Sequence, residues 1–266
     1  MDYKVFYRKY RPQNFDELVG QDHIKDLLLK SIVNNKLSHA YLFTGPRGTG
    51  KTSTAKLFAK TINCENCLNG IPCNKCPACV SYNETVDILE IDAASNNGVD
   101  EIRELRENVK ILPTFSKYKV YIIDEVHMLS SSAWNAFLKT LEEPPHHVIF
   151  ILATTEIQKV PITVLSRCQR FDFQKLSAEV IASHIDKIAK NEKIKITSEA
   201  INEIATLADG SLRDGLSILD QLSKLDLKID VDTITSAYGI LSTNDVENLL
   251  KAVSTGDVAT YVKNID

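Results

Sequence analysis

The sequence predicts an α/β fold, in which a parallel-sheet domain with a cysteine-rich insertion is followed by a small all-helical domain. Two observations carry this prediction. Short apolar segments of strand length alternate with helical patterns as far as residue 173, which is the signature of a sheet built from βαβ units. Beyond Leu176 the strand pattern stops, and apolar residues recur only with helical period. Strands are expected at residues 40–43, 88–91, 120–123, 148–153 and 169–173.

Helices are predicted from the spacing of apolar residues and from signals at the helix ends. Between the third and fourth strands, apolar residues at positions i, i+3, i+4 and i+7 from Trp134 form one helical face, which the prolines at 144–145 end. Trp134 is therefore expected in the core. In the second domain Thr197 or Ser198 would cap one helix, and Gly210 would separate that helix from the next.

These patterns divide the chain into three parts. Residues 1–176 would form the sheet domain, with the cysteine-rich insertion at 64–79, and residues 177–241 would form the helical domain. Residues 242–266 are expected to be the truncated start of a further helical domain, because roughly 25 residues are too few to bury a core of their own.

The composition is that of an ordinary globular protein and excludes several classes. The chain has 266 residues, of which 44% are apolar and 25% are charged, unlike a collagen-like, disordered or disulfide-scaffold sequence. No apolar run approaches the ~20 residues that span a bilayer, and the N-terminus lacks the apolar core of a signal peptide. A cytoplasmic protein is expected. The net charge of −4 argues against a broadly basic nucleic-acid-binding domain, but not against a local binding surface.

One segment has the P-loop pattern. Residues 45–52 read G-P-R-G-T-G-K-T, directly after the strand predicted at 40–43 and at the start of a helix. Glycines let successive N–H groups curl toward phosphate oxygens, and the helix adds its positive N-terminal end. Lys51 would reach the β- and γ-phosphates, and the Thr52 hydroxyl would coordinate Mg²⁺. The segment therefore predicts a nucleoside triphosphate site.

A second motif places two acidic residues at the end of a strand. The apolar run 120–123 is followed by Asp124 and Glu125. A carboxylate at the carboxyl end of a strand faces the ligand crevice of an α/β sheet. Asp124 would hold the Mg²⁺ shell, and Glu125 would orient or deprotonate the attacking water. His127 is compatible with a role at the site and equally with a satisfied polar residue beside it.

Five of the six cysteines lie between Cys64 and Cys79. In a reducing compartment such crowding indicates a metal site rather than a disulfide framework. Thiolates spaced by two residues suit tetrahedral Zn²⁺, and spacing alone favours Cys64 and Cys67 paired with Cys76 and Cys79. A structural zinc site is predicted, with an iron–sulfur cluster as the alternative.

Three further segments are polar. Thr154 and Thr155 end the fourth strand, a place from which a hydroxyl would sense the γ-phosphate. Arg167 lies after a short helical turn, next to Cys168, which is expected to be a small buried residue. Arg213 lies in the first turn of a helix, where a cation opposes the helix dipole and calls for a compensating anion. Taken singly, such arginines are more often surface salt-bridge partners, but a nucleotide site makes them candidate arginine fingers.

Together these residues resemble the AAA+ clamp loaders. The resemblance covers essentially the whole chain. It rests on the P-loop, on the cysteine insertion, and on segments 8–12, 15–21, 124–129, 141–145, 153–155 and 166–168. It implies a P-loop AAA+ domain followed by a helical lid domain, and a zinc site formed by Cys64, Cys73, Cys76 and Cys79, with Cys67 as an extra thiol.

The resemblance also assigns roles at the nucleotide site. Thr155 resembles the sensor-1 residue, and Arg213 resembles the sensor-2 arginine that reaches the nucleotide from the lid. Arg167 would be the finger that enters the ATP site of a neighbouring subunit. The implied catalytic set is Lys51, Asp124, Glu125, Thr155, Arg167 and Arg213. The implied nucleotide-binding set is Tyr7, Arg11, Pro12, Val19, Gly45, Gly48, Thr49, Gly50, Lys51, Thr52 and Arg213.

The resemblance implies an ATP-hydrolysing motor subunit of the bacterial replicative clamp loader, using ATP, Mg²⁺ and Zn²⁺. Its partners would be other loader subunits, further copies of itself, the sliding clamp and primed DNA, and no membrane. Helix N-termini would follow the DNA backbone; the matching places are Asn97, Gly98 and Thr163, with Lys139 as a charged contact. The alternatives are a nucleotide-binding scaffold without useful hydrolysis, and a hexameric helicase or translocase of the same superfamily.

Overall fold

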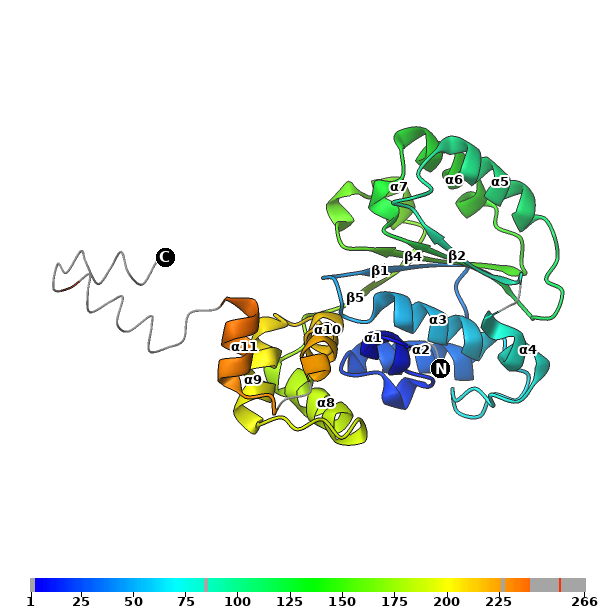
Figure 1. Ribbon diagram of the computed structural model, residues 1–266. Helices are drawn as coiled ribbons and strands as arrows, with labels where there is room; N and C mark the ends of the chain where they lie inside the picture. Colours follow the sequence, from blue (N-terminus) through cyan, green and yellow to red (C-terminus); the bar gives the residue numbers. More distant parts are fainter. Residues whose placement is uncertain (1–2, 84–85, 226–227, 240–253, 255–266) are drawn as a thin grey trace.

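The computed structural model describes residues 3–83, 86–225, 228–239 and 254. These residues form a three-layer α/β/α unit and, beside it, a helical unit (Figure 1). The helices are α1 (Phe6–Lys9), α2 (Asp22–Val33), α3 (Lys51–Ile62), α4 (Pro77–Val80), α5 (Val99–Val109), α6 (Ser131–Glu142), α7 (Ile162–Leu165), α8 (Ala178–Asn191), α9 (Ser198–Leu207), α10 (Leu212–Leu222) and α11 (Val231–Tyr238). Short 3₁₀ turns are η1 (Phe15–Glu17), η2 (Ser81–Asn83), η3 (Val126–Met128), η4 (Ile157–Lys159) and η5 (Ser223–Leu225).

The sheet is parallel throughout, in the order β2-β3-β4-β1-β5. Its strands lie where the apolar runs predict them, and the α/β fold class is confirmed. The central strands are buried on both faces because helices cover both, which is why their sequences are continuous apolar runs rather than alternating ones. The bounds are β1 (Ala40–Thr44), β2 (Ile88–Asp92), β3 (Lys119–Asp124), β4 (Val148–Thr154) and β5 (Gln169–Asp172).

Successive strand residues pack into two separate cores. On one face, α5, α6 and α7 cover a core that contains Leu42, Tyr121 and Phe150 (Figure 1). On the other face, α2 and α3 cover a core that contains Tyr41 and Phe43. Trp134 lies in the first core, with only 4% of its surface exposed, and burial of a side chain of this size contributes about 2–3 kcal/mol.

The parallel register brings three strand ends to one edge of the sheet. Thr44 at the end of β1 pairs with Thr154 at the end of β4, and Ile123 in β3 pairs with Leu152 in β4. The P-loop follows β1, and Asp124 is the last residue of β3. This edge is therefore where a ligand would bind in an open α/β sheet.

The helical unit consists of α8, α9, α10 and α11. Its helices begin at polar caps: Thr197 Oγ1 accepts from Ala200 N–H (3.2 Å), and Ser211 Oγ accepts from Asp214 N–H (3.2 Å). Of the two predicted cap residues for α9, Thr197 is thus the one used. The apolar faces of α8, α9 and α10 meet in a core of their own.

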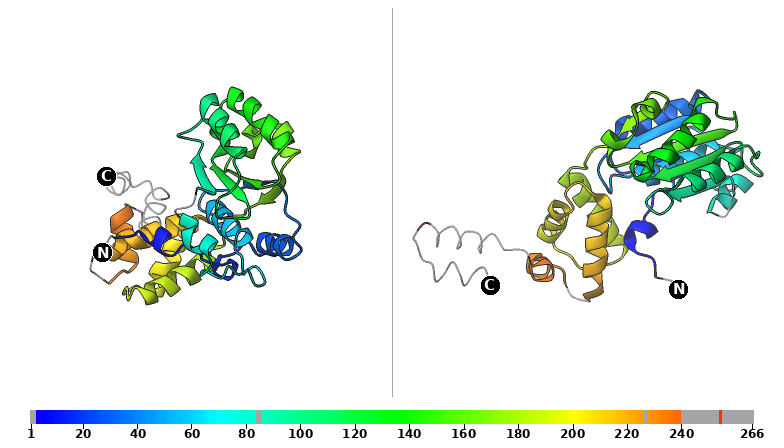
Figure 2. Two further views of the ribbon diagram at one scale, coloured as in Figure 1. Left: turned by 90° about the vertical axis from the view of Figure 1, so that its right-hand side faces the viewer. Right: turned by 90° about the horizontal axis from the view of Figure 1, so that it is seen from above.

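The short helix α1 packs against the helical unit although it begins the described chain. Phe6 is buried in the core of the helical unit, and Phe6 N–H donates to the Asp220 carboxylate (3.2 Å). Lys9 Nζ pairs with Glu192 (2.6 Å), and the Tyr10 hydroxyl donates to the same carboxylate. Figure 2 shows α1 beside α10 in both views.

The predicted third segment, 242–266, falls almost entirely outside the described residues, so its helix stays a prediction. Among the residues that the structure describes, no helix combines the length and apolarity required to cross a membrane.

Candidate nucleotide site

The P-loop connects β1 to α3 through three glycines with positive φ: Gly45 (141°), Gly48 (74°) and Gly50 (101°). This conformation suits glycine because it has no Cβ to clash. Gly45 N–H donates to the Thr154 carbonyl (3.2 Å), which joins the loop to the end of β4. Lys51 Nζ donates to the Gly45 and Pro46 carbonyls, both at 2.8 Å, so the ammonium group lies within the curl of the loop.

The P-loop also touches the helical unit. A Cβ built on Gly48 would lie 1.8 Å from Ser211 Oγ and 2.8 Å from Ser211 Cβ, the residue that caps α10. Only glycine fits at this distance. The loop and the start of α10 therefore form one continuous surface.

The acidic pair faces the P-loop. Thr52 Oγ1 donates to Asp124 Oδ2 at 2.6 Å, which places the two predicted Mg²⁺ ligands side by side. Lys51 is 6% exposed; burial lowers the pKa of its ammonium group, and the charges of Glu125 and Asp124 oppose that shift. The site thus pairs a desolvated cation with two carboxylates.

Glu125 has a left-handed backbone (φ 49°), uncommon outside glycine, which turns its side chain toward the end of β4. Its Oε2 accepts from the Thr155 hydroxyl (3.1 Å) and from Thr155 N–H (3.3 Å). The sequence places these residues 30 positions apart, and the adjacent β3 and β4 strands bring them together. A carboxylate that is held at one oxygen is suited to orienting a water with the other.

These groups line one cavity of about 250 Å³ between the sheet unit and the helical unit. Most predicted nucleotide-binding residues lie on its wall: Tyr7, Arg11, Pro12, Val19, Gly48, Thr49, Gly50, Lys51, Thr52 and Arg213, together with Asp124 and Glu125. Gly45 and Thr155 are not among the lining residues; each contacts a lining residue instead, Gly45 through Lys51 and Thr155 through Glu125.

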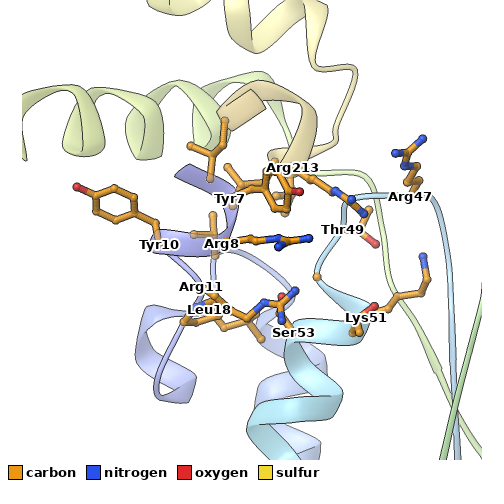
Figure 3. A pocket seen from close by; sticks show the side chains of 18 of the residues that line it. Tyr7, Arg8, Tyr10, Arg11, Leu18, Arg47, Thr49, Lys51, Ser53 and Arg213 are labelled. Carbon is orange, nitrogen blue, oxygen red and sulfur yellow. The ribbon is translucent and has the colours of Figure 1, made fainter. Parts of the chain in front are cut away.

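The cavity is also lined by residues outside the predicted site set. Arg8 and Arg47 add two cations, and Leu176, Leu212 and Leu216 add an apolar wall. Figure 3 shows Arg8 and Arg213 extending together toward the P-loop, with Arg47 and Lys51 on the far side of the loop. Leu212 and Leu216 have the helical period of core positions in α10, so no pattern marks them as ligand contacts. Arg8 lies in segment 8–12, which contributes to the resemblance to clamp loaders, but neither its residue type nor its spacing marks it as a ligand contact.

Arg213 contacts an aromatic ring of the N-terminal segment. Its guanidinium carbon lies 4.9 Å from the centroid of the Tyr7 ring, a cation–π distance. Burial alone would raise the pKa of Tyr7, but Arg8 and Arg213 together hold it below its usual value. Among the residues that the structure describes, no carboxylate pairs with Arg213, so the anion expected beside it is not a protein group; the arginine lines the cavity.

Arg167 lies away from this cavity. Its guanidinium donates to the Thr163 carbonyl (2.6 Å) and pairs with Glu142 (2.9 Å) at the end of α6. Arg167 therefore does not join the site of its own chain. Cys168 beside it is partly buried, and burial raises the pKa of its thiol to about 12.

Four thiols gather at one point of the insertion: the sulfur atoms of Cys64, Cys73, Cys76 and Cys79 all lie within 4.8 Å of one another. Cys67 is not in this group, so the sulfur positions favour the ligand set that the resemblance implies over the pairing favoured by spacing alone. The reason is the tight turn between the bridged residues Leu68 and Ile71, after which Cys73 N–H donates to Cys64 Sγ (3.2 Å). The N–H groups of residues 75 and 76 lower the pKa of the Cys73 thiol to about 6, which favours the thiolate that a metal needs.

The four predicted DNA-contact residues lie on the face of the sheet covered by α5, α6 and α7. Asn97 and Gly98 precede α5, Lys139 lies in the last turn of α6, and Thr163 is in α7. The first turn of α5 also contains Asp100 and Glu101, which counter its helix dipole. The positions of these four residues do not show whether they contact phosphate, so the DNA contacts stay predictions.

The residues present fit a magnesium nucleotide. The curled P-loop supplies backbone donors, and the Thr52–Asp124 pair supplies oxygen ligands of the kind that Mg²⁺ prefers. Arg11 Nε, on a residue that lines the cavity, is buried without a hydrogen-bond partner among the described residues. A buried donor of this kind calls for an acceptor from a ligand or a water. The four-thiol cluster similarly fits a structural zinc ion.

Fold and site together define an AAA+ P-loop protein. The family model for the DNA polymerase III delta subunit matches residues 20–177, and the model for the DNA polymerase III clamp loader subunit, ATPase lid domain, matches residues 180–222. The chain is 55% identical over 223 residues to the DNA polymerase III subunit tau of Bacillus subtilis, covering 83% of this chain and 40% of that one. It is 36% identical over 265 residues to the subunit gamma of Buchnera aphidicola subsp. Baizongia pistaciae, covering 98% of this chain and 72% of that one. The chain belongs to the DNA polymerase III gamma/tau family, and the resemblance to clamp loaders is confirmed.

The chain corresponds to part of its longer relatives, and its fold is shared with a more distant protein. The chain spans about two fifths of the length of the Bacillus, Mycoplasma and Haemophilus relatives that it matches. Among solved structures, Thermotoga maritima RuvB, a Holliday junction branch migration motor, matches with a TM-score of 0.63 at 17% identity, covering 93% of this chain and 80% of that one. At this identity the likeness establishes the shared fold alone.

Proposed function

We propose that this chain is an ATP-hydrolysing motor subunit of the bacterial replicative clamp loader, which loads the sliding clamp onto primed DNA within the DNA polymerase III holoenzyme. The observation that carries the proposal is the single cavity in which the P-loop, the acidic pair and a lid arginine meet, in a chain of the gamma/tau family. ATP and Mg²⁺ are the proposed ligands of this cavity.

Each residue of the site has a role in the proposed reaction. The P-loop N–H groups and Lys51 hold the phosphates and neutralise developing charge. Thr52 and Asp124 would hold Mg²⁺, which supplies further charge neutralisation when bound. Glu125 orients the attacking water and accepts its proton, while Thr155, bonded to the same carboxylate, reports the state of the γ-phosphate to β4.

Nucleotide binding would also couple the two units. Tyr7, Arg11, Pro12 and Val19 from the N-terminal segment line the proposed adenine side, and Arg213 reaches over from the lid. Because these groups come from separate elements, a bound nucleotide would hold the lid against the sheet unit. The proposed domains remain 1–176 and 177–241, with α1 of the first packed on the second, and 242–266, which lies almost entirely outside the described residues, as the start of a collar domain.

Hydrolysis is proposed to need a neighbour. Arg167 lies outside the cavity of its own chain but is partly exposed, so it is available to a second subunit. The proposed neighbours are further copies of this chain and subunits of the delta and delta prime type. The proposed zinc site at Cys64, Cys73, Cys76 and Cys79 is structural, because all four ligand positions are filled by protein thiols. DNA contacts at residues 97, 98, 139 and 163, and a cytoplasmic location, belong to the same proposal.

Steady-state ATP hydrolysis tests the function. The full-length protein is assembled with delta- and delta-prime-type subunits and assayed with and without the clamp and primed DNA. We expect turnover to rise when both are added, and to be lost in Lys51→Ala but kept in Lys36→Ala, an exposed lysine outside the site. Turnover that is indifferent to clamp, DNA and partner subunits would contradict the proposal.

A further inference from the structure

His127 lies in η3, the turn that follows the acidic pair, and is nearly enclosed: 7% of its side chain is exposed. Its Nδ1 is 3.0 Å from Thr154 Oγ1 and 3.4 Å from Glu125 Oε2. Its Nε2 is 3.2 Å from Glu156 Oε1. The ring therefore lies between two carboxylates, one of which lines the nucleotide cavity.

The contacts of this ring join two loops. Glu125 and His127 belong to the turn after β3, whereas Thr154 and Glu156 belong to the end of β4 and the loop behind it. The second loop is itself held, because Glu156 N–H donates to Thr154 Oγ1 (3.0 Å) and the Glu156 carboxylate pairs with Lys159 (2.9 Å). His127 is thus attached to a fixed support.

Glu125 needs such a support. Its backbone is in a sparsely populated conformation, and its carboxylate is 34% exposed, so the side chain has room to rotate. The contacts from Thr155 and from His127 all reach the same oxygen, Oε2. A carboxylate that orients water must be held in position within a fraction of an ångström. A contacting group that is itself anchored on a second loop can provide this precision.

We propose that His127 is a positioning residue for Glu125, which holds the carboxylate in place for water activation by linking it to Glu156 behind β4. Nδ1 faces both Thr154 Oγ1 (3.0 Å) and Glu125 Oε2 (3.4 Å), so a proton on Nδ1 is shared between the Thr154 hydroxyl and the Glu125 carboxylate, whereas a proton on Nε2 is donated to Glu156. The inference rests on the proposed ATPase function.

Three substitutions separate the polar role from packing. His127→Phe keeps a ring of similar shape without polar atoms, His127→Asn keeps a polar group near the Nδ1 position, and His127→Ala removes both. In the full-length protein assembled with its partner subunits, we expect kcat to fall about 10- to 100-fold in the Ala and Phe variants, with KM and the affinity for ATP nearly unchanged. The Asn variant recovers part of the loss. His146→Ala, at an exposed histidine, is the matched control.

A double-mutant cycle tests the link itself. Glu156→Gln should lower kcat in the wild-type background and have no further effect in His127→Ala, because the link is already broken. Full activity of the Phe variant, or additive effects of the two changes, would overturn the positioning role. If the Ala variant fails to fold, the Phe and Asn variants decide the question. A wild-type complex without turnover would instead overturn the proposed function.

Discussion

Replacement of Gly48 by alanine tests whether the P-loop and the lid form one surface. The backbone at Gly48 is left-handed (φ 74°), which costs an alanine about 1–2 kcal/mol. The new methyl group would also displace the Ser211 hydroxyl, and loss of that cap at α10 costs about 0.5–2 kcal/mol. We therefore expect Gly48→Ala to lower the free energy of unfolding by about 1.5–4 kcal/mol and to weaken nucleotide binding.

The control is Gly239→Ala. This glycine has a similar φ (62°), but no atom lies within 4 Å of an added Cβ, so only the backbone cost of about 1–2 kcal/mol applies. Urea unfolding followed by circular dichroism and by fluorescence of Trp134, the single tryptophan, measures both variants. Addition of Ser211→Gly to Gly48→Ala should restore part of the difference. Equal losses for the two alanine variants would show that Ser211 does not restrict the loop.

Three further predictions concern other parts of the molecule. Arg167→Ala should reduce ATP turnover of the assembled full-length complex by roughly 10³-fold or more while nucleotide binding survives; unchanged turnover would refute the finger. Cys73→Ser should lose bound zinc, measured with a chromogenic chelator after purification, whereas Cys67→Ser should keep it; the reverse result would restore the spacing-based ligand set. Burial alone would raise the pKa of Asp87, but the N–H groups of residues 114, 115 and 116 donate to its carboxylate and hold its pKa below the usual value. The stability that this carboxylate contributes is therefore present above about pH 4 and is lost as the pH falls through the lowered pKa. Asp87→Asn should therefore cost roughly 2–4 kcal/mol at pH 7 and progressively less below pH 4, measured by urea unfolding across that range; a pH-independent difference would refute this.

The strands and the phosphate loop were predictable because their signals are local. A buried parallel strand is a short apolar run, and a P-loop needs glycines at fixed spacing. The packing of α1 was not predictable, because a helix of four residues has no periodicity and its partner, Asp220, is far away in sequence. The choice of Cys73 over Cys67 likewise depends on a turn geometry that spacing does not encode.

At the nucleotide site, the residues with obligatory chemistry were predictable and those that shape the cavity were not. Lys51 and Asp124 lie in motifs whose residue types are required for binding the phosphates and Mg²⁺. Leu216 has the same spacing as a core leucine, and only the assembled fold shows that it faces a cavity. The sequence left two interpretations open for His127. The structure places its ring beside carboxylates of two loops, which the sequence alone does not indicate, and the His127 substitutions proposed above would distinguish the two interpretations.

The attachment of α1 to the helical unit makes that unit discontinuous, since Phe6 completes a core whose bonding partner Asp220 lies 214 positions later. On a nascent chain, the sheet can close once β5 has been made, whereas the helical unit must wait for its own helices and then bind α1, which precedes the sheet in the sequence. Contacts of such separation are slow to form. Tyr7 and Arg8 sit in the same segment, so the nucleotide pocket becomes complete only when this late closure has taken place. Competence to bind a nucleotide therefore depends on the helical unit having formed and bound α1.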